Sequence, residues 1–345
     1  MKTKINLAII GFGKRGKTHY RNLSNNENVK IVAICDPRKQ EIDDKLINWY
    51  SDPKEMLSNE KIDAAIISTP TTEHYTVAKY FISAKTPLLL EKPATKTIQE
   101  AIDLYELALE NETLCFIGYN FRFDSKINKI KQIIDNKEIG RVLMIRGRQS
   151  HNWGGAKPFE WSLKKAESGG GTIIDNATHY IDLFQYLIGN ISDVYAISNN
   201  LGFNSEVEDN AIISIKFSNK VIGVIETSWK DESGRNNSIH IWGDKGVIKF
   251  DQTNEGENLD IIKYKSDKDE WNRFQSEKVY IPKGIEQVNK KSNLDNNKNL
   301  MAENTKRMLD YFLSLVIDNQ EASKYMKKND FSKNVKIISD IYNNN

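Results

Sequence analysis

The first 120 residues alternate short apolar runs with amphipathic segments. The apolar runs have the length of strands and lie at residues 5–10, 29–34, 62–68, 87–90 and 113–117. Parallel strands need crossover helices between them and are buried on both faces, so an unbroken apolar run such as residues 88–90 suits a parallel sheet. We therefore predict a doubly wound α/β domain of the Rossmann type over residues 1–120.

After about residue 120 the pattern changes. Helical patterns at 125–136 and 172–187 enclose a strand pattern at 142–150. Alternating apolar and polar runs follow at 194–198, 211–217, 221–228, 238–241 and 247–250. This spacing is typical of antiparallel strands joined by turns. Residues 121–345 are therefore predicted to form an α+β domain with a large, mostly antiparallel open sheet.

The end of the chain contains a polar segment and two helical patterns. Residues 284–300 read GIEQVNKKSNLDNNKNL, which is rich in Asn and Lys and has few apolar side chains to bury. This composition predicts a mobile loop. The helical patterns at 301–317 and 331–342 are predicted to pack against the rest of the chain.

Composition and charge exclude several classes of protein. The chain has 345 residues, more than the roughly 250 to 300 at which a single core stops growing, so two domains are expected. Lys and Arg total 49 against 47 Asp and Glu, and no one-signed block indicates binding to nucleic acid or an acidic membrane. No apolar run reaches the roughly 18 residues of a membrane span, and the first run is too short for a secretory signal. We expect a soluble, cytoplasmic protein.

A glycine-rich turn follows the first predicted strand and opens a predicted helix. The turn consists of Gly11, Phe12, Gly13, Lys14, Arg15 and Gly16. Glycines in this pattern permit a tight turn, close approach to a pyrophosphate and packing of the helix on the strand. The N-terminus of the helix offers N–H groups to the phosphates. We predict a dinucleotide-binding site here.

An acid at the end of the second strand bears on the identity of the cofactor. Asp36 lies 20 residues after Gly16, where it is expected to accept hydrogen bonds from the adenosine ribose. A carboxylate there repels a 2′-phosphate and favours NAD. Arg38 and Lys39 are close enough in sequence to neutralise such a phosphate, so NADP stays possible.

The loops after the next two strands are expected to border the dinucleotide as well. In a doubly wound sheet the carboxyl ends of the strands face the ligand crevice. Thr69, Pro70 and His74 follow the third strand, and Glu91 and Lys92 follow the fourth. Helix capping or simple packing is the alternative interpretation of the first loop, and an exposed loop cation that of Lys92.

A second group of polar residues lies on the predicted helix at 172–187. Asp175 and His179 are four residues apart and share one helix face with Asp182. A carboxylate beside an imidazole fixes its tautomer and strengthens it as a general base. The three glycines at 169–171 are expected to let the first turn approach a ligand closely. A packed histidine and a stabilising acid at a helix N-terminus are the alternative.

Together these motifs resemble the glucose-fructose oxidoreductase/inositol dehydrogenase (Gfo/Idh/MocA) family. They are GFGKRGKTHY at 11–20, AICDP at 33–37, ISTPTTEHYTVA at 67–78, EKPATKT at 91–97, YNFRFD at 119–124 and GGGTIIDNATHYIDL at 169–183. The resemblance implies an NAD(P)-dependent oxidoreductase acting on sugars, polyols or nucleotide sugars. It also implies a homodimer or homotetramer formed through the exposed face of the second sheet.

The resemblance implies roles for three residues. Lys92 is the lysine of the EKP motif, and Asp175 and His179 are the acid and histidine of the second motif. His179 would remove the hydroxyl proton while the carbinol hydrogen leaves as hydride to C4 of the nicotinamide. Lys92 would hydrogen-bond the reacting oxygen. Asp175 would orient the substrate or the histidine, with Asp182 competing for that role, and Ala177 replaces a glycine frequent in the family.

Substrate contacts are predicted from residue type. Arg122 suits an anion, Asn176 suits hydroxyl groups, and Trp153, near His151, suits the face of a sugar ring. Trp161 could serve the same purpose or belong to the core. No metal site is predicted.

Three functions are compatible with these residues. The first is a sugar or polyol dehydrogenase, or the reverse ketone reductase. The second is a redox-neutral glycosidase or lyase that keeps its NAD bound, and the third is a non-catalytic dinucleotide-binding sensor. The presence of Lys92, Asp175 and His179 favours an enzyme, because a sensor has no need of a proton-transfer set.

Overall fold

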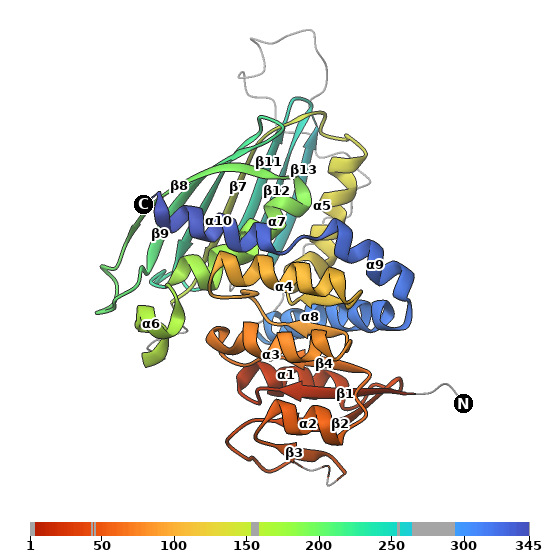
Figure 1. Ribbon diagram of the computed structural model, residues 1–345. Helices are drawn as coiled ribbons and strands as arrows, with labels where there is room; N and C mark the ends of the chain where they lie inside the picture. The colour runs from red at the N-terminus through yellow and green to blue at the C-terminus, as the bar shows by residue number, and fades with distance from the viewer. Residues whose placement is uncertain are drawn as a thin grey trace, which may run out of the picture. The chain divides into compact units, whose positions relative to one another are not determined.

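A computed structural model describes residues 4–42, 44, 46–152, 159–253, 256–263 and 294–344 (Figure 1), and of residues 294–301 it describes the backbone. The chain forms two compact units. The first, Met1–Phe123 with Leu300–Ser339, is called the Rossmann unit below. The second, Asp124–Asn299 with Asp340–Asn345, is called the sheet unit.

The Rossmann unit is built on a parallel sheet. Its strands are β1 (Ile5–Ile10), β2 (Val29–Cys35), β3 (Asn48–Tyr50), β4 (Ala64–Ile67), β5 (Leu88–Leu90) and β6 (Cys115–Ile117). Among the described residues the six strands are arranged in the order β3-β2-β1-β4-β5-β6. The strand order reverses between β1 and β4, which is where ligands bind in such sheets. The predicted parallel α/β domain is confirmed.

Helices connect these strands. They are α1 (Lys14–Leu23), α2 (Pro53–Asn59), α3 (Thr71–Ser83) and α4 (Ile98–Glu110), followed by the 3₁₀ turn η1 (Asn120–Phe123). Helices α2 and α4 begin at residues whose side chains cap them. Asp52 caps α2 ahead of a proline, and Thr97 and Glu100 form a capping box at α4. The centre of the sheet forms part of the hydrophobic core, since Leu7 of β1 and Ile66 of β4 are fully buried.

Residues 300–339 of the C-terminal helices belong to the Rossmann unit rather than to the predicted second domain, and the end of the last helix, from Asp340, belongs to the sheet unit. The C-terminal helices are α8 (Leu294–Ile317), α9 (Asn319–Lys328) and α10 (Ser332–Asn343). Phe312 of α8 is fully buried in the Rossmann core, and Tyr325 of α9 stacks on Phe116 of β6 with ring centroids 5.1 Å apart. Residues 294–300 of the predicted mobile loop are helical, whereas residues 284–293 lie outside the described residues.

The sheet unit carries the second sheet. Its strands are β7 (Val142–Ser150), β8 (Ile191–Asn199), β9 (Asn210–Phe217), β10 (Ile222–Ser228), β11 (Asn236–Gly243), β12 (Gly246–Thr253) and β13 (Gly256–Lys263). Among the described residues the seven strands follow the order β13-β12-β11-β7-β10-β9-β8. Strands β7 and β10 run parallel, and the other neighbouring pairs are antiparallel. The predicted mostly antiparallel sheet is confirmed.

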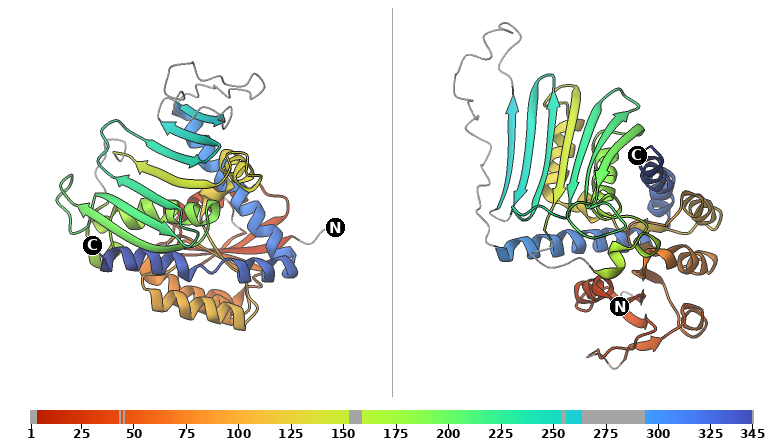
Figure 2. Two further views of the ribbon diagram at one scale, coloured as in Figure 1. Left: turned by 90° about the horizontal axis from the view of Figure 1, so that it is seen from above. Right: turned by 90° about the vertical axis from the view of Figure 1, so that its left-hand side faces the viewer.

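Helices cover one face of this sheet. Figure 2 shows α5 (Ser125–Asp135) and α7 (Thr178–Leu187) on the same side of the strands. A Cβ at Gly147 of β7 would lie 2.3 Å from the ring of Tyr180, so the glycine permits α7 to pack directly on the sheet. Alternate residues of β8 and β9 point the other way, and Ile197 and Ile212 remain exposed there.

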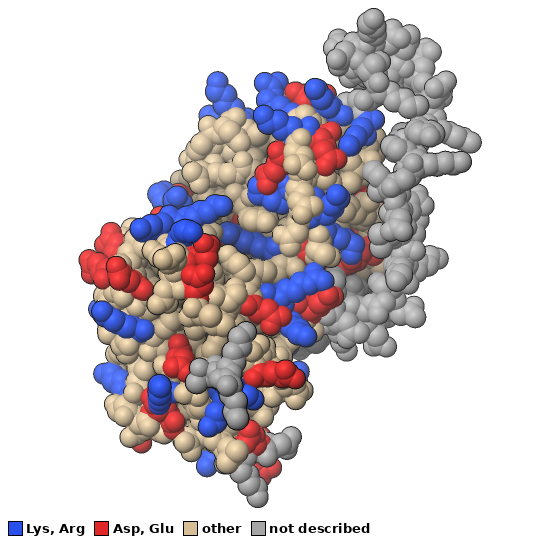
Figure 3. Space-filling view, turned by 90° about the vertical axis from the view of Figure 1, so that its right-hand side faces the viewer, with Lys and Arg blue, Asp and Glu red and all other residues tan. Residues whose placement is uncertain are grey.

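The surface charges are mixed in sign. On the face drawn in Figure 3, Lys and Arg side chains alternate with Asp and Glu side chains over the described residues. Within the described part of the chain, no helix combines the length and the apolar character needed to cross a membrane.

Candidate active site

The glycines of the β1–α1 turn have three different environments. Gly11 has a φ of +84°, and a Cβ there would lie 2.6 Å from the backbone nitrogen of Thr69. A Cβ on Gly16 would lie 2.1 Å from the carbonyl oxygen of Gly11. Gly13, by contrast, has no atom of the described residues within 4 Å of an ideal Cβ. The turn and the packing therefore use Gly11 and Gly16, and Gly13 leaves room for a pyrophosphate at the start of α1.

Asp36 lies at the end of β2, beside this turn. Its carboxylate accepts hydrogen bonds from the backbone N–H of Phe12 at 2.8 Å and of Arg38 at 2.9 Å. A carboxylate has about four acceptor positions, so both oxygens can still accept from a ribose diol. The Arg38 side chain is 84% exposed, with its Nε 3.8 Å from Asp36. These residues fit the adenosine ribose of NAD.

Aromatic packing holds the turn in place. The buried Phe12 ring contacts Tyr20 and Trp49 edge to face, with centroids 5.7 and 5.6 Å away. The indole of Trp49 donates a hydrogen bond to the backbone oxygen of Asp36 at 2.9 Å. In the first turn of α1, Lys14 is exposed and Arg15 is half-buried.

His74 connects two loops of the predicted cofactor site. The ring is 1% exposed. Its Nδ1 lies 2.9 Å from the carbonyl oxygen of Pro93, and its Nε2 lies 3.0 Å from that of Thr69, which precedes Pro70, the N-cap of α3. Burial lowers the pKa of His74, although both carbonyl groups and Glu91 oppose this shift. A neutral imidazole has one N–H, so it donates to one of the two carbonyl oxygens, and the ring lies between the two loops with protein groups facing both of its nitrogens.

Glu91 forms a buried pair with a residue of α1. Its Oε1 lies 2.7 Å from Nε2 of His19, which is fully buried. Burial by itself would raise the pKa of Glu91, but Arg15, the hydrogen bond from His19 and Lys92 outweigh burial and hold the pKa well below its ordinary value. The predicted cofactor contact at Glu91 is thus an ionised group that ties α1 to the loop after β5.

Lys92 is the second residue after the end of β5 and is half-buried. The peptide bond between Lys92 and Pro93 is cis. Because β1, β4 and β5 are neighbours in the sheet, Gly11, Thr69 and Lys92 all lie at the carboxyl edge of adjacent strands. The structure therefore brings the predicted cofactor residues of the Rossmann unit together.

Arg122, a predicted substrate residue, lies in η1. Its Nη1 donates a hydrogen bond to the side-chain oxygen of Asn329 at 3.1 Å. Asn329 follows α9, so this arginine also holds the C-terminal helices of the Rossmann unit.

In the sheet unit, Asp175 and His179 lie on either side of a change in helix type. Asp175 belongs to the π-helical turn η4 (Ile173–Ala177), and His179 lies in the first turn of α7. A π turn contains more residues than an α turn, so the two side chains do not keep the spacing of the predicted continuous α-helix. Asp175 is half-buried, while His179 and Asp182 are buried. Such π turns occur frequently at functional sites.

Asn176 does not have the exposure expected of a substrate contact. The residue is 3% exposed, and its amide donates to Thr172 Oγ1 at 3.1 Å. Thr172 in turn bonds the hydroxyl of Thr227 on β10 at 2.6 Å. Asn176 therefore belongs to the contact between η4 and the sheet.

The three glycines before η4 accommodate protein groups rather than a ligand. Gly169 has a φ of +81°, which favours glycine. A Cβ on Gly170 would lie 1.9 Å from the hydroxyl of Tyr342, and one on Gly171 would lie 1.8 Å from the backbone oxygen of Glu208. The close approach that the glycines predict is made by the chain itself.

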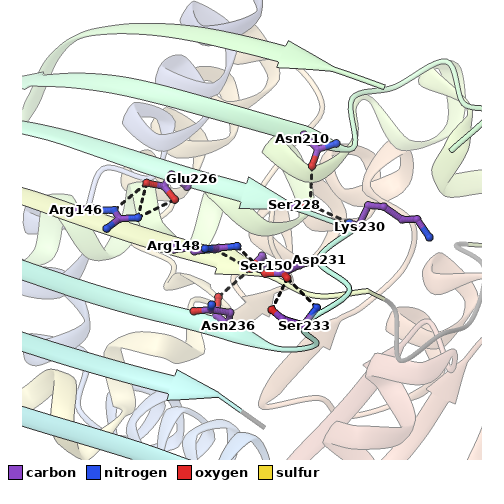
Figure 4. A network of polar contacts seen from close by, with 10 residues as sticks. All are labelled: Arg146, Arg148, Ser150, Asn210, Glu226, Ser228, Lys230, Asp231, Ser233 and Asn236. Carbon is purple, nitrogen blue, oxygen red and sulfur yellow. Dashed lines mark hydrogen bonds and ion pairs between the residues drawn. The ribbon is translucent and has the colours of Figure 1, made fainter. Parts of the chain in front are cut away.

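A polar network fixes the carboxyl ends of β7 and β10 (Figure 4). Asp231 accepts hydrogen bonds from Ser150 at 2.5 Å and from Arg148 at 2.8 Å. Burial would raise the pKa of Asp231, but its hydrogen bonds from Ser150 and Ser233 and the charge of Arg148 keep the pKa lowered. The backbone of His151 bonds to the same turn.

The two tryptophans considered as substrate contacts differ in what the structure describes. Trp153 lies outside the described residues. Trp161 is 53% exposed and stacks on Phe159 with ring centroids 6.4 Å apart, so it is not a core residue.

The fold and the dinucleotide fingerprint define a protein that binds a dinucleotide through a Rossmann domain. Comparison with known families agrees. Residues 5–119 match the model described as oxidoreductase family, NAD-binding Rossmann fold, and residues 127–249 match the GFO/IDH/MocA C-terminal domain. The chain belongs to the Gfo/Idh/MocA family of NAD-dependent oxidoreductases, as the sequence motifs predict.

Individual relatives span most of the chain. The oxidoreductase YrbE of Bacillus subtilis (strain 168) is 30% identical over 265 residues, which cover 73% of this chain and 75% of the relative. Myo-inositol 2-dehydrogenase of Thermotoga maritima is 27% identical, with 72% and 76% covered. The solved structure of levoglucosan dehydrogenase with NADH and levoglucosan has a TM-score of 0.78 at 21% identity, covers 99% of this chain and 97% of its own, and shows a common fold.

Proposed function

We propose that the protein is an NAD-dependent dehydrogenase that oxidises a secondary hydroxyl group of a sugar or polyol, or reduces the corresponding ketone. The observation that carries this proposal is the position of Lys92, at the end of β5 beside the strand ends that hold the dinucleotide fingerprint. The proposal is supported by relatives whose names state myo-inositol and levoglucosan as substrates.

The Rossmann unit offers a fitting site for NAD. Gly13 and the first turn of α1 would hold the pyrophosphate, and Asp36 would hold the adenosine ribose. When bound, NAD supplies an acceptor for the hydride that leaves the substrate carbon. Because the Asp36 carboxylate repels a 2′-phosphate and Arg38 extends into solvent, we propose NAD rather than NADP as the preferred cofactor.

Three side chains are assigned to the substrate. Lys92 donates a hydrogen bond to the reacting oxygen and stabilises the negative charge that develops there. His179 accepts the hydroxyl proton, and Asp175 orients the histidine or the substrate. General-base assistance of this kind contributes typically about 10²- to 10⁴-fold to the rate.

The test is a substrate survey. Purified protein is mixed with NAD or NADP and with myo-inositol, other polyols, aldoses, sugar acids or nucleotide sugars, and the absorbance of the reduced cofactor is recorded. We expect a rise with NAD and one group of polyhydroxy substrates. Failure of the whole panel with a protein that binds NADH would contradict the proposal and favour a redox-neutral enzyme or a sensor.

A further inference from the structure

Glu208 is a buried acid that the proposed chemistry does not use. It precedes β9 and is 9% exposed. Its Oε1 accepts hydrogen bonds from the backbone N–H of Gly171 at 2.9 Å and of Ile173 at 3.0 Å. Its backbone oxygen accepts from the N–H of Thr172 at 2.9 Å. One residue thus binds three consecutive N–H groups at the start of the segment that carries Asp175.

These N–H groups need a partner from elsewhere in the chain. The first N–H groups of a helix have no acceptor within the helix, and a carboxylate near them also opposes the positive end of the helix dipole. At η4 the side chain of the N-cap residue, Thr172, does not supply that acceptor. Glu208, which is 37 residues after Gly171 in the sequence, supplies the acceptor instead.

The same carboxylate oxygen also binds the end of the chain. The hydroxyl of Tyr342, near the end of α10, donates to Oε1 of Glu208 at 2.9 Å. Burial, followed by the Glu208 charge and hydrogen bond, raises the pKa of Tyr342, so the hydroxyl keeps its proton and remains a donor. Burial raises the pKa of Glu208 as well, against the donors that face it.

Gly170 and Gly171 have no room for a side chain in this arrangement. Any side chain at Gly170 would meet the Tyr342 hydroxyl, and any side chain at Gly171 would meet the backbone of Glu208. Gly170, Gly171, Glu208 and Tyr342 therefore form one close-packed contact at the start of η4. Asp175 follows two residues after Ile173, and His179 lies one turn further.

We propose that Glu208 and Tyr342 are a positioning pair, which fixes the start of η4 and thereby the directions of Asp175 and His179. Neither residue is assigned a contact with substrate. The inference rests on the proposed function, because it gives the pair a role in the rate of that reaction. A displacement of about 1 Å at a reacting group can cost about 10²-fold in rate, so a small shift of η4 is sufficient to be measured.

The central variant is Tyr342→Phe, which removes the hydroxyl and keeps the ring. We expect kcat to fall about tenfold, with an unchanged affinity for NADH, since the Rossmann unit is untouched. Glu208→Gln keeps an acceptor oxygen and is expected to retain more activity than Glu208→Ala. Asn344→Ala is the matched control, because Asn344 anchors the same chain end to the carbonyl of Val194 at 3.2 Å.

Hydrogen exchange provides a readout that needs no turnover. The amides of residues 171–173 are expected to exchange faster in Tyr342→Phe and in Glu208→Gln, and at the wild-type rate in Asn344→Ala. Faster exchange together with a lower kcat supports the pair as a positioning device. Unchanged exchange overturns the inference, and so does faster exchange with an unchanged kcat.

The inference and the proposed function fail in different ways. A wild-type protein that oxidises no substrate contradicts the proposed function before any variant is made. An active wild-type protein whose Tyr342→Phe variant has the same kcat contradicts the inference alone. If Glu208→Ala does not fold, Tyr342→Phe and Glu208→Gln still decide the question.

Discussion

At the scale of single residues, Glu91 shows how a buried charge is kept ionised beside a proposed catalytic lysine. His19 and Arg15 come from α1, and Lys92 is its neighbour in sequence. The loop after β5 is held to α1 by a charged hydrogen bond, which is stronger than a neutral one. Because the pair of Glu91 and His19 holds the loop that carries Lys92, the free energy of unfolding should depend on the protonation of Glu91.

We predict that Glu91→Gln lowers the free energy of unfolding at pH 7 by about 1.5 to 3 kcal/mol, the contribution of a hydrogen bond to a charged group. The folded-state pKa of Glu91 lies below its ordinary value of 4.5, so its stabilisation is complete above that value and is lost as the pH falls towards the folded-state pKa. Urea unfolding from pH 7 downwards should show the difference shrink below about pH 4.5. Glu110→Gln, at an exposed site, is the control, and a pH-independent difference would refute this explanation.

Asp36 gives a second prediction at this scale. Asp36→Asn keeps the side-chain shape but removes the charge that repels a 2′-phosphate. We expect the ratio of kcat/KM for NADP to kcat/KM for NAD to rise about tenfold. This factor corresponds to about 1.4 kcal/mol, which is the size of one hydrogen bond. Steady-state kinetics with both cofactors measure the ratio. A wild-type preference for NADP would contradict the role given to Asp36.

At the scale of elements, different glycines of the β1–α1 turn are expected to serve stability and cofactor binding. Gly11→Ala places a Cβ 2.6 Å from backbone atoms at a φ of +84°, whereas Gly13→Ala meets no atom of the described residues within 4 Å. We predict that Gly11→Ala lowers the free energy of unfolding by more than about 2 kcal/mol. Gly13→Ala should change it by less than about 1 kcal/mol and yet weaken NADH binding at least about tenfold. Thermal unfolding and NADH fluorescence titrations test both, and equal binding by Gly13→Ala would refute the pyrophosphate site.

Several elements could be predicted from the sequence because an apolar run coincided with a strand. Strands β1 and β7 have the predicted bounds. Strand β13 was not predicted, since its residues do not alternate in burial: Gly256 to Ile262 are half-buried and Lys263 is exposed. Helix α9 was not predicted either, because Ala322 and Met326 are its buried residues among the described side chains. Amphipathic patterns also could not show that α8 packs on the Rossmann unit, because the pattern shows which helix face is apolar and not which element covers that face.

The candidate site divides in a similar way. Gly11, Lys92 and His179 are predicted as site residues from motifs, because the chemistry fixes both their type and their local spacing. His19, Glu208 and Tyr342 could not, because they act through contacts across long separations, 134 residues between Glu208 and Tyr342. The two carbonyl groups of Thr69 and Pro93 that face the His74 ring could not be predicted from the sequence, because they come from different loops.

At the scale of the whole molecule, the face of the second sheet opposite α5 and α7 carries exposed apolar side chains among the described residues. Tyr195 and Ile197 of β8 and Ile212 of β9 are 55%, 68% and 55% exposed, and Ile197 pairs directly with Ile212. Contiguous exposed apolar residues commonly mark an interface between proteins. We propose that two or four copies of the chain associate through this face.

The double variant Ile197→Lys with Ile212→Lys tests this association. We predict that the wild-type protein is a dimer or tetramer and that the variant is a monomer, because an interface core does not accept unpaired charges. Sedimentation equilibrium gives both masses. Leu201→Lys is the control, since Leu201 is 86% exposed and follows the end of β8. A monomeric wild-type protein would contradict the proposal.

In the proposed reaction, Lys92 and His179 act on the substrate hydroxyl group, which loses its proton, while the hydride leaves the carbinol carbon for NAD. The most direct measurement is the rate of NADH formation at 340 nm by the wild-type protein, Lys92→Ala and His179→Ala, with the substrate that the survey identifies. We predict that each substitution lowers kcat by at least about 10²-fold with NADH affinity unchanged. Undiminished turnover in either variant would contradict the role assigned to that residue.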